Sequence, residues 1–229
     1  MKIEMEKLKS YLKKIKLNGT NEVQEIVLNF DNNGLNISTL SPTNVIKAVG
    51  LLKRIAFSEY EEIGKFAVSD LPTIIKILDK FSGNIEIIKT ENSIIIKGSN
   101  KEVTIELLDL QFIQEQDSEI KLVYDDCFKV PIDDLHGVVD DNSVNKEFKL
   151  VLETVVGGLK IYSEGKYKFK KNIVCESKLE NKVKLLDPFI DGIINLNSDV
   201  LLSVKSDYPI KIEEKTDESD ITLIIAPSI

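Results

Sequence analysis

The strongest constraint in the sequence is a pattern of strands that occurs twice, once in each half of the chain. "IVLNFDNNGLNIST" and "KLVLETVVGGLKIYSE" both predict a strand, a turn before Gly-Leu and a second strand. "TENSIIIKGSNKEVTIELLD" and "SDYPIKIEEKTDESDITLIIAPS" both predict a hairpin that follows a helical pattern. The order helix, strands, helix, strands therefore repeats. It predicts an α+β fold of two similar domains, each with two helices against antiparallel sheet.

Length and hydropathy agree with two small domains in a soluble protein. The 229 residues are 42% hydrophobic, which is enough for a sizeable core in each half. No stretch approaches the roughly 18 apolar residues of a membrane span, and "MKIEMEKLKSYLKKIK" lacks the apolar core of a signal peptide. We therefore expect a cytoplasmic protein with three parts: a first domain over 1–109, an extended connector over 110–122 and a second domain over 123–229.

Four stretches have helical periodicity. "EMEKLKSYLKKIK" places apolar residues on one face and lysines on another. "SDLPTIIKILDKFSG" opens with Asp70 before a first-turn proline and sets Lys76 and Lys80 one turn apart. "VPIDDLHGVVDDN" and "KVKLLDPFIDGIIN" are the weaker third and fourth candidates, because they contain Gly137 and Pro188. Pro188 is compatible with a mid-helix kink or with a first-turn position after a capping Asp187.

The net charge of −8 lies entirely in the second half. Residues 1–110 carry equal numbers of basic and acidic side chains, so residues 111–229 hold the whole excess of Asp and Glu. The first two predicted helices are basic, whereas the third has four aspartates and no lysine. A polyanion responds to this local distribution, so we expect the second domain to hold one only weakly.

An enzymatic function has little support. His136 has four aspartates nearby, which is compatible with a metal or acid–base site. A solvated acidic helix end is the favoured interpretation, since no second histidine, nucleophile or phosphate-binding glycine loop accompanies it. Cys127 and Cys175 lack the close spacing of zinc or redox motifs, and we expect them in a core or an interface. We predict no catalytic activity, cofactor or metal.

Five further stretches are informative together: "SYLKKIK", "NNGLNISTLSPTNV", "LLDLQFIQEQ" at the start of the connector, "DYPIKIEEK" and the terminal "LIIAPSI". In their order and spacing they resemble the DNA sliding clamps of the proliferating cell nuclear antigen type, from archaea and eukaryotes. The resemblance covers nearly the whole chain and implies a ring of three two-domain subunits. In such a ring the helices line a central hole, the sheets form the outside, and the clamp acts as a polymerase processivity factor.

The resemblance also implies a sequence-independent grip on double-stranded DNA. Helices that face a duplex should present lysines to its phosphates without reading its bases. Ordinary solvated helix faces are the alternative reading of the same lysines. The residues expected to face DNA are Lys9, Lys13, Lys14, Lys76, Lys80 and Lys184.

The resemblance also implies a pocket that binds partner proteins, and such a pocket would explain why the chain ends on apolar residues. In the family, the last residues help to wall a pocket for short peptide motifs of DNA polymerase, flap endonuclease, DNA ligase and clamp loader. The alternative is that the tail only packs as core. Lys47 and Ser228 depart from the family pattern, which leaves the partner preference open. The expected pocket residues are Leu40, Val45, Ile113, Pro209, Ile224, Ala226 and Pro227.

Ring closure is expected to join two sheet edges. "KEVTIELL" would pair with "NIVCES" of the next subunit, because an unpaired edge of that length invites aggregation. The expected interface residues are Val103, Ile105, Leu107, Ile173 and Cys175. A homotrimer is favoured over a heterotrimer, in a prokaryotic cytoplasm at the nucleoid. The rival outside this family is a non-catalytic β-rich assembly scaffold that binds proteins but not DNA.

Overall fold

The computed structural model describes residues 1–113, 121–142, 148–185 and 192–228. The chain divides into two compact units. Unit 1 is Met1–Pro42, Ala48–Asp117 and Thr216–Ile221, and unit 2 is Thr43–Lys47, Ser118–Lys215 and Thr222–Ile229. Most of the expected connector, residues 114–120, lies outside the described residues.

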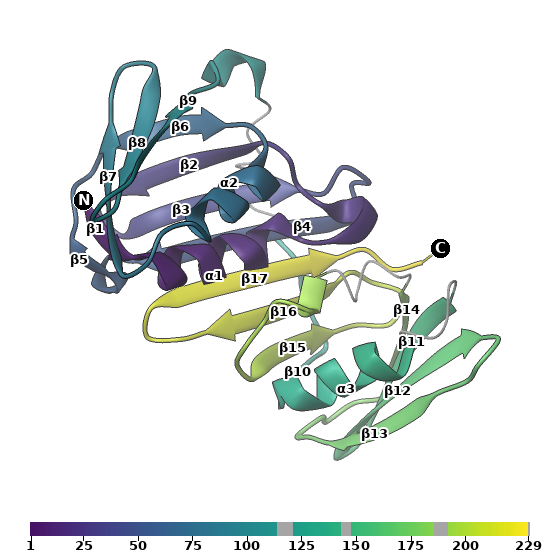
Figure 1. The fold of residues 1–229 in the computed structure, drawn as a ribbon. Coiled ribbons are helices and arrows are strands. Elements are labelled where there is room, and N and C mark those ends of the chain that lie inside the picture. The colour runs from purple at the N-terminus through teal and green to yellow at the C-terminus, as the bar shows by residue number, and fades with distance from the viewer. Residues whose placement is uncertain (114–120, 143–147, 186–191, 229) are drawn as a thin grey trace. The chain divides into compact units, whose positions relative to one another are not determined.

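Unit 1 combines two helices with two antiparallel sheets (Figure 1). One sheet has the strand order β5-β1-β7-β8-β9, and in the other the order is β4-β3-β2-β6. The elements are β1 (Lys2–Glu4), α1 (Met5–Lys16), β2 (Ile26–Asp31), β3 (Gly34–Leu40), β4 (Ile46–Lys53), β5 (Phe57–Glu59), β6 (Gly64–Val68), α2 (Leu71–Leu78), β7 (Asn84–Lys89), β8 (Ser93–Lys97) and β9 (Glu102–Glu106), with 3₁₀ turns at Gly19–Asn21, Arg54–Ala56 and Leu110–Phe112. The first two residues of β4 belong to unit 2.

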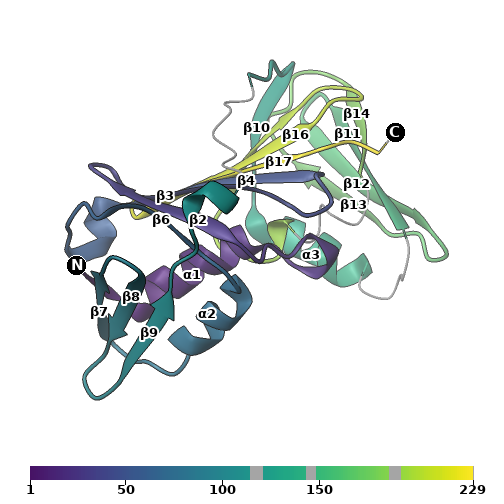
Figure 2. The same ribbon diagram turned by 90° about the horizontal axis from the view of Figure 1, so that it is seen from above.

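Both helices predicted for the first half are confirmed. The α1 stripe of Met5, Leu8, Leu12 and Ile15 is fully buried, as its periodicity predicts. Asp70 caps α2 by accepting a hydrogen bond from the Thr73 amide at 3.1 Å, as expected for an aspartate before a first-turn proline. The two helices lie side by side (Figures 1 and 2) and bury their apolar faces in the core of unit 1.

Unit 2 has one described helix and two groups of antiparallel strands. Its strand orders are β13-β12-β11-β14 and β10-β15-β16-β17. The elements are β10 (Asp126–Val130), α3 (Ile132–Asn142), β11 (Phe148–Val155), β12 (Gly158–Gly165), β13 (Lys170–Val174), β14 (Asn181–Leu185), β15 (Val200–Val204), β16 (Ile210–Lys215) and β17 (Ser219–Ile225), whose first residues belong to unit 1.

The prediction of a fourth helix over 182–195 is wrong at its start. Residues 181–185 form β14, in which Asn181, Val183 and Leu185 are buried and alternate with exposed Lys182 and Lys184. This period of two belongs to a strand, and pairing with β11 stabilises it. Residues 186–191 lie outside the described residues, and residues 192–193 are helical.

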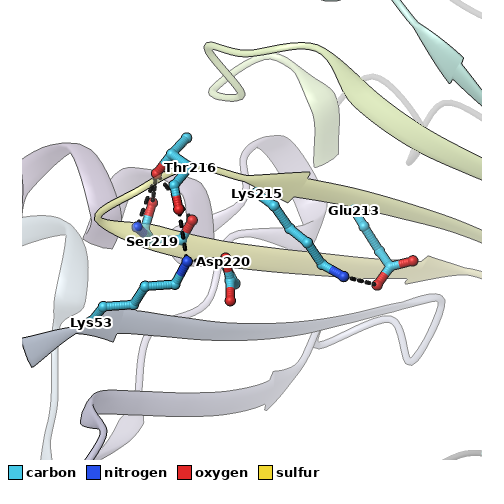
Figure 3. A network of polar contacts seen from close by, with 6 residues as sticks. All are labelled: Lys53, Glu213, Lys215, Thr216, Ser219 and Asp220. Carbon is cyan, nitrogen blue, oxygen red and sulfur yellow. Dashed lines mark hydrogen bonds and ion pairs between the residues drawn. The ribbon is translucent and has the colours of Figure 1, made fainter.

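The hairpin that leads into the C-terminal strand is tied to β4 by polar contacts within unit 1 (Figure 3). The Thr216 hydroxyl donates to the Ser219 carbonyl at 3.0 Å, which closes the turn. Lys53 Nζ pairs with Asp220 at 2.8 Å and donates to the Thr216 carbonyl at 2.7 Å. In unit 2, Lys215 pairs with Glu213 at 3.4 Å at the end of β16. These bonds fix where β17 begins, and therefore which of its residues point inward.

Asp126 at the start of β10 joins two segments of unit 2. The residue is only 6% exposed, and its carboxylate accepts hydrogen bonds from the Ser177 hydroxyl at 2.6 Å and from the amides of Cys127, Lys178 and Leu179. Burial by itself raises the pKa of Asp126, but these four hydrogen bonds outweigh it and hold the pKa below its usual range. The folded state therefore favours the ionised carboxylate.

We predict that Asp126→Asn lowers the free energy of unfolding at pH 7 by about 2 kcal/mol, since charge-assisted bonds are lost and one amide hydrogen faces another donor. Because the folded-state pKa is lowered, this contribution is complete above about pH 5 and is lost as the pH falls through that lowered pKa. Urea unfolding of both proteins across pH 3 to 7 measures it. A gap that stays constant over the whole range would contradict the ionised-carboxylate explanation.

Candidate functional site

The lysines of α1 are less open than the sequence suggests. Lys9 Nζ lies 2.7 Å from Glu6 and 3.0 Å from Asp79, and its side chain is 13% exposed. Hydrogen bonds to these two carboxylates raise the pKa of Lys9. Lys14 is only 5% exposed, and Lys13 is half-buried. Lys9 thus ties α1 to the end of α2, and a ligand would have to compete with that role.

The end of α2 supplies the more accessible positive charge of unit 1. Lys76 and Lys80 are exposed. A hydrogen bond from Lys9 lowers the pKa of Asp79, and the charges of Lys13 and Lys80 lower it further. One carboxylate is therefore shared among several lysines, so this surface of α1 and α2 keeps a positive excess.

Lys184 does not belong to a helical surface. It lies on β14 and shares a sheet face with Val151 and Tyr162, through the register of β14, β11 and β12. The helix α3 lies on the other face of this sheet, where Lys171 of β13 pairs with Asp134 at 3.0 Å. The expectation that Lys184 faces DNA from a fourth helix loses its structural basis, because side chains alternate between the two faces of a strand.

The end of the chain is half core and half surface. Ile221, Leu223 and Ile225 of β17 are buried, whereas Ile224 between them is half-exposed. The Ala226 amide donates to the Val45 carbonyl at 2.9 Å, and the Ser228 amide donates to the Lys184 carbonyl at 2.8 Å. The tail therefore packs into unit 2 and also presents apolar atoms on its surface.

The expected pocket residues fall into two groups. Val45, Pro209, Ile224, Ala226 and Pro227 belong to unit 2, and all are half-exposed. Leu40 and Ile113 belong to unit 1 and are half-exposed as well. Lys47, at the position that departs from the family pattern, is buried. Partial exposure of every member suits a binding surface, and their union in one pocket stays a prediction.

The strands expected to form the subunit interface are both at sheet edges. β9 ends one sheet of unit 1, with Val103 and Ile105 half-exposed on one face. Leu107 follows it and is half-exposed too. β13 ends a sheet of unit 2, but its Ile173 is 4% exposed, and Cys175 beyond the strand is half-buried. An unpaired edge on each unit is the geometry that head-to-tail pairing requires.

No metal-binding group of His, Cys, Asp and Glu occurs among the residues that the structure describes. His136 Nε2 is buried and has no hydrogen-bond partner within the same residues. Cys127 and Cys175 are free thiols. In the described part of the chain, no helix combines the length and hydropathy needed to cross a membrane.

Two solved structures have a fold similar to that of this chain. No protein-family model matches the chain, and no curated protein matches it. A. fulgidus PCNA was solved in a structure described as the C-terminal region of FEN-1 bound to A. fulgidus PCNA. It aligns over 100% of this chain and 97% of its own, with a TM-score of 0.86 and 16% identity. Entamoeba histolytica PCNA aligns over 100% of this chain and 98% of its own, with a TM-score of 0.83 and 16% identity.

The chain has the PCNA fold. The α+β clamp architecture expected from the resemblance is thereby confirmed. At 16% identity the likeness concerns the fold, so the roles of individual residues depend on their own surroundings.

Sequence reasoning missed three features of this PCNA-fold chain. Val174 of β13 is 91% exposed, whereas the neighbouring Ile173 that we expected at the interface is buried. The Tyr124 and Tyr208 rings meet edge to face at 6.0 Å beside Pro209, and burial raises the pKa of Tyr124. The pairing of Lys171 with the acidic helix α3 is the third. The alternation of "KKNIV" was the available signal for Val174, and no local signal pairs residues so distant in sequence.

Proposed function

We propose that the chain is a sliding clamp that encircles duplex DNA and tethers DNA-processing enzymes. The observation that carries the proposal is the PCNA fold over the full chain, with TM-scores of 0.83 to 0.86. The clamp holds its partners and catalyses no reaction. It acts on the DNA of a prokaryotic cell. The chain consists of a first domain over 1–109, a connector over 110–122 and a second domain over 123–229.

The grip on DNA is sequence-independent and comes mainly from unit 1. Lys76 and Lys80 are its most accessible lysines, and Lys9, Lys13 and Lys14 contribute from more enclosed positions. α3 has Asp133 and Asp134 in its first turn and adds little attraction. Uneven charge of this kind suits sliding, because a water-filled gap of about 8 Å screens local repulsion at physiological salt.

The partner site is the apolar surface of unit 2 around Ile224, with Val45, Pro209, Ala226 and Pro227. The resemblance to the clamp family adds Leu40 and Ile113 as expected members. The partners of this site are DNA polymerase, flap endonuclease, DNA ligase and the clamp loader, through short peptide motifs. The A. fulgidus PCNA described above was solved with the C-terminal region of FEN-1, which supports this assignment. Anchors that fill such a surface carry most of the binding energy.

Subunits join through the edges of β9 and β13, with Val103, Ile105 and Leu107 on one side and the Ile173–Cys175 segment on the other. Each chain carries both edges, so a homotrimer is favoured over a heterotrimer. A protein scaffold without DNA binding is the second candidate, favoured only by the net charge of −8.

For the DNA grip, we predict that Lys13, Lys76 and Lys80→Ala together weaken binding to a 30-base-pair duplex and flatten its salt dependence by about two to three units of log Kd against log salt. Fluorescence anisotropy between 50 and 200 mM NaCl measures both. The matched control is Lys182 and Lys184→Ala, which should change little. An equal loss of duplex affinity in both variants would show that the lysines of α1 and α2 are not the main contacts to DNA.

A second experiment tests whether the protein encircles the duplex. After incubation with a biotinylated duplex, streptavidin blocks on both ends should retain the protein through a high-salt wash, because a ring leaves linear DNA only at its ends. Loss at the same rate with open and blocked ends would favour the scaffold.

For the partner site, we predict that Ile224→Asp weakens binding of the A. fulgidus FEN-1 C-terminal peptide by at least about 30-fold, since a buried anchor would meet a charge. Isothermal titration calorimetry gives the affinity, and Ile224→Val is the control that keeps the apolar surface. Unchanged affinity in the aspartate variant would remove Ile224 from the site.

For assembly, light scattering should give about three times the chain mass of 25.8 kDa for the native protein. Ile105→Asp should shift it toward the monomer, because a charge would be buried at the joined edges. Thr104→Asp, on the opposite face of β9, is the control. A native protein that is monomeric at micromolar concentration would contradict the homotrimer.

A further inference from the structure

The edge strand β9 of unit 1 carries carboxylates on the face turned away from the core (Figure 1). Val103 and Ile105 share the core face of the sheet, because their register sets them opposite buried isoleucines of β8. The residues that alternate with them point to solvent. They are Glu102, Thr104 and Glu106, and all three are exposed.

Only one of the two carboxylates of β9 is compensated within its own chain. Lys97 of β8 lies opposite Glu102 and pairs with it at 3.2 Å. Glu106 lies opposite Ser93, and within the described residues it forms no ion pair. The end of β9 therefore presents an unpaired negative charge at the edge of its sheet.

The edge strand β13 of unit 2 has the complementary charge. Lys171 pairs with α3 and Ile173 is buried, so these two residues lie on the core face. The residues that alternate with them, Lys170, Asn172 and Val174, are exposed on the other face. Lys170 forms no ion pair in the part of the chain that the structure describes. This edge therefore presents an unpaired positive charge.

We propose that Glu106 of one subunit pairs with Lys170 of the next copy of this chain, and that this ion pair sets the register in which β9 and β13 join. The inference rests on the proposed ring, in which these two edges meet. An antiparallel junction continues the antiparallel order of both sheets. With Glu106 opposite Lys170, the polar side chains of Thr104 and Asn172 also lie opposite one another.

The same register joins mainly apolar groups on the core face. The opposite pairs there are Val103 with Ile173, Ile105 with Lys171 and Leu107 with Phe169. The first and third pairs are apolar, and in the second the aliphatic stem of the lysine covers the isoleucine. All of these side chains except Ile173 are half-exposed in the single chain, so the junction would bury them further.

Neighbouring registers fit less well. A slide of one residue would set the core face of one sheet against the solvent face of the other. A slide of two residues toward the C-terminal end of β13 sets Glu102 opposite Glu176, and like charges directly opposite one another destabilise a sheet. A slide of two residues the other way sets Lys101 opposite Ile173, which then loses its apolar neighbour. Both faces therefore favour the register with the ion pair.

The first test reverses each charge separately and then both together. Glu106→Lys and Lys170→Glu each place like charges opposite one another, and each should weaken a junction about fivefold. Because a ring of three has three junctions, the dissociation constant from trimer to monomers should rise about a hundredfold. The variant with both substitutions restores opposite charges and should return to within about tenfold of the native value. Mass photometry on a dilution series in 150 mM NaCl measures the trimer fraction.

The matched controls are Glu61→Lys in unit 1 and Lys129→Glu in unit 2. They make the same changes of charge at exposed positions outside β9 and β13, and both should assemble as the native protein does. Single variants that assemble as tightly as the native protein would overturn the pairing. A doubly substituted chain that assembles no better than the single variants would overturn it as well.

Cysteine cross-linking tests the register itself. In a cysteine-free background, Thr104→Cys with Asn172→Cys should form disulfides between subunits under mild oxidation, because opposite residues have the spacing that a disulfide needs. Covalent trimers on a non-reducing gel are the readout. Thr104→Cys with Val174→Cys, and with Lys170→Cys, are the controls for the two registers displaced by two residues. Faster cross-linking in either control would overturn the proposed register.

Failure of this inference is distinguishable from failure of the clamp. A native trimer whose stability is unchanged in every charge-reversal variant would remove the ion pair and leave the ring standing. A native protein that stays monomeric at micromolar concentration would overturn both the ion pair and the homotrimer.

Discussion

The alternation of side chains along a strand, with one face covered by core, determines most of what this molecule shows to its surroundings. On β17, burial of Leu223 and Ile225 leaves Ile224 at the surface. On β13, burial of Ile173 turns Val174 outward, and on β14 burial of Val183 turns Lys184 outward. A shift of one residue in any of these registers would reverse the exposed set.

The same constraint explains which parts of the fold could be predicted. α1, α2 and the two hairpins carry unambiguous periods, so their residues alone determine them. The stretch from Lys182 also satisfies a helical pattern over a few residues, and only pairing with β11 selects the strand. Tertiary pairing of this kind cannot be read locally, which is why the expected fourth helix was wrong at its start.

The sequence predicted which residue types form the candidate sites, but not the ion pairs and burial of each side chain. Lysines on a helix surface were expected to be open, yet Lys9 is held between Glu6 and Asp79, and Lys14 is buried. Glu6 lies on the same helix as Lys9, whereas Asp79 lies at the end of α2. Sequence spacing reveals the first kind of pair and not the second.

The charge of unit 2 is separated by the sheet rather than spread evenly. α3 brings aspartates to one face, where Lys171 meets Asp134. The opposite face carries five lysines and two glutamates: Lys149, Lys160, Lys170, Lys182 and Lys184, with Glu153 and Glu164. A domain with an excess of acidic residues therefore still has one face with an excess of positive charge. A polyanion that approaches the α3 side would meet aspartates, and one that approaches the opposite side would meet lysines. Because the two groups of charge lie on opposite faces of one sheet, the net charge of a domain does not predict how each of its surfaces meets a polyanion.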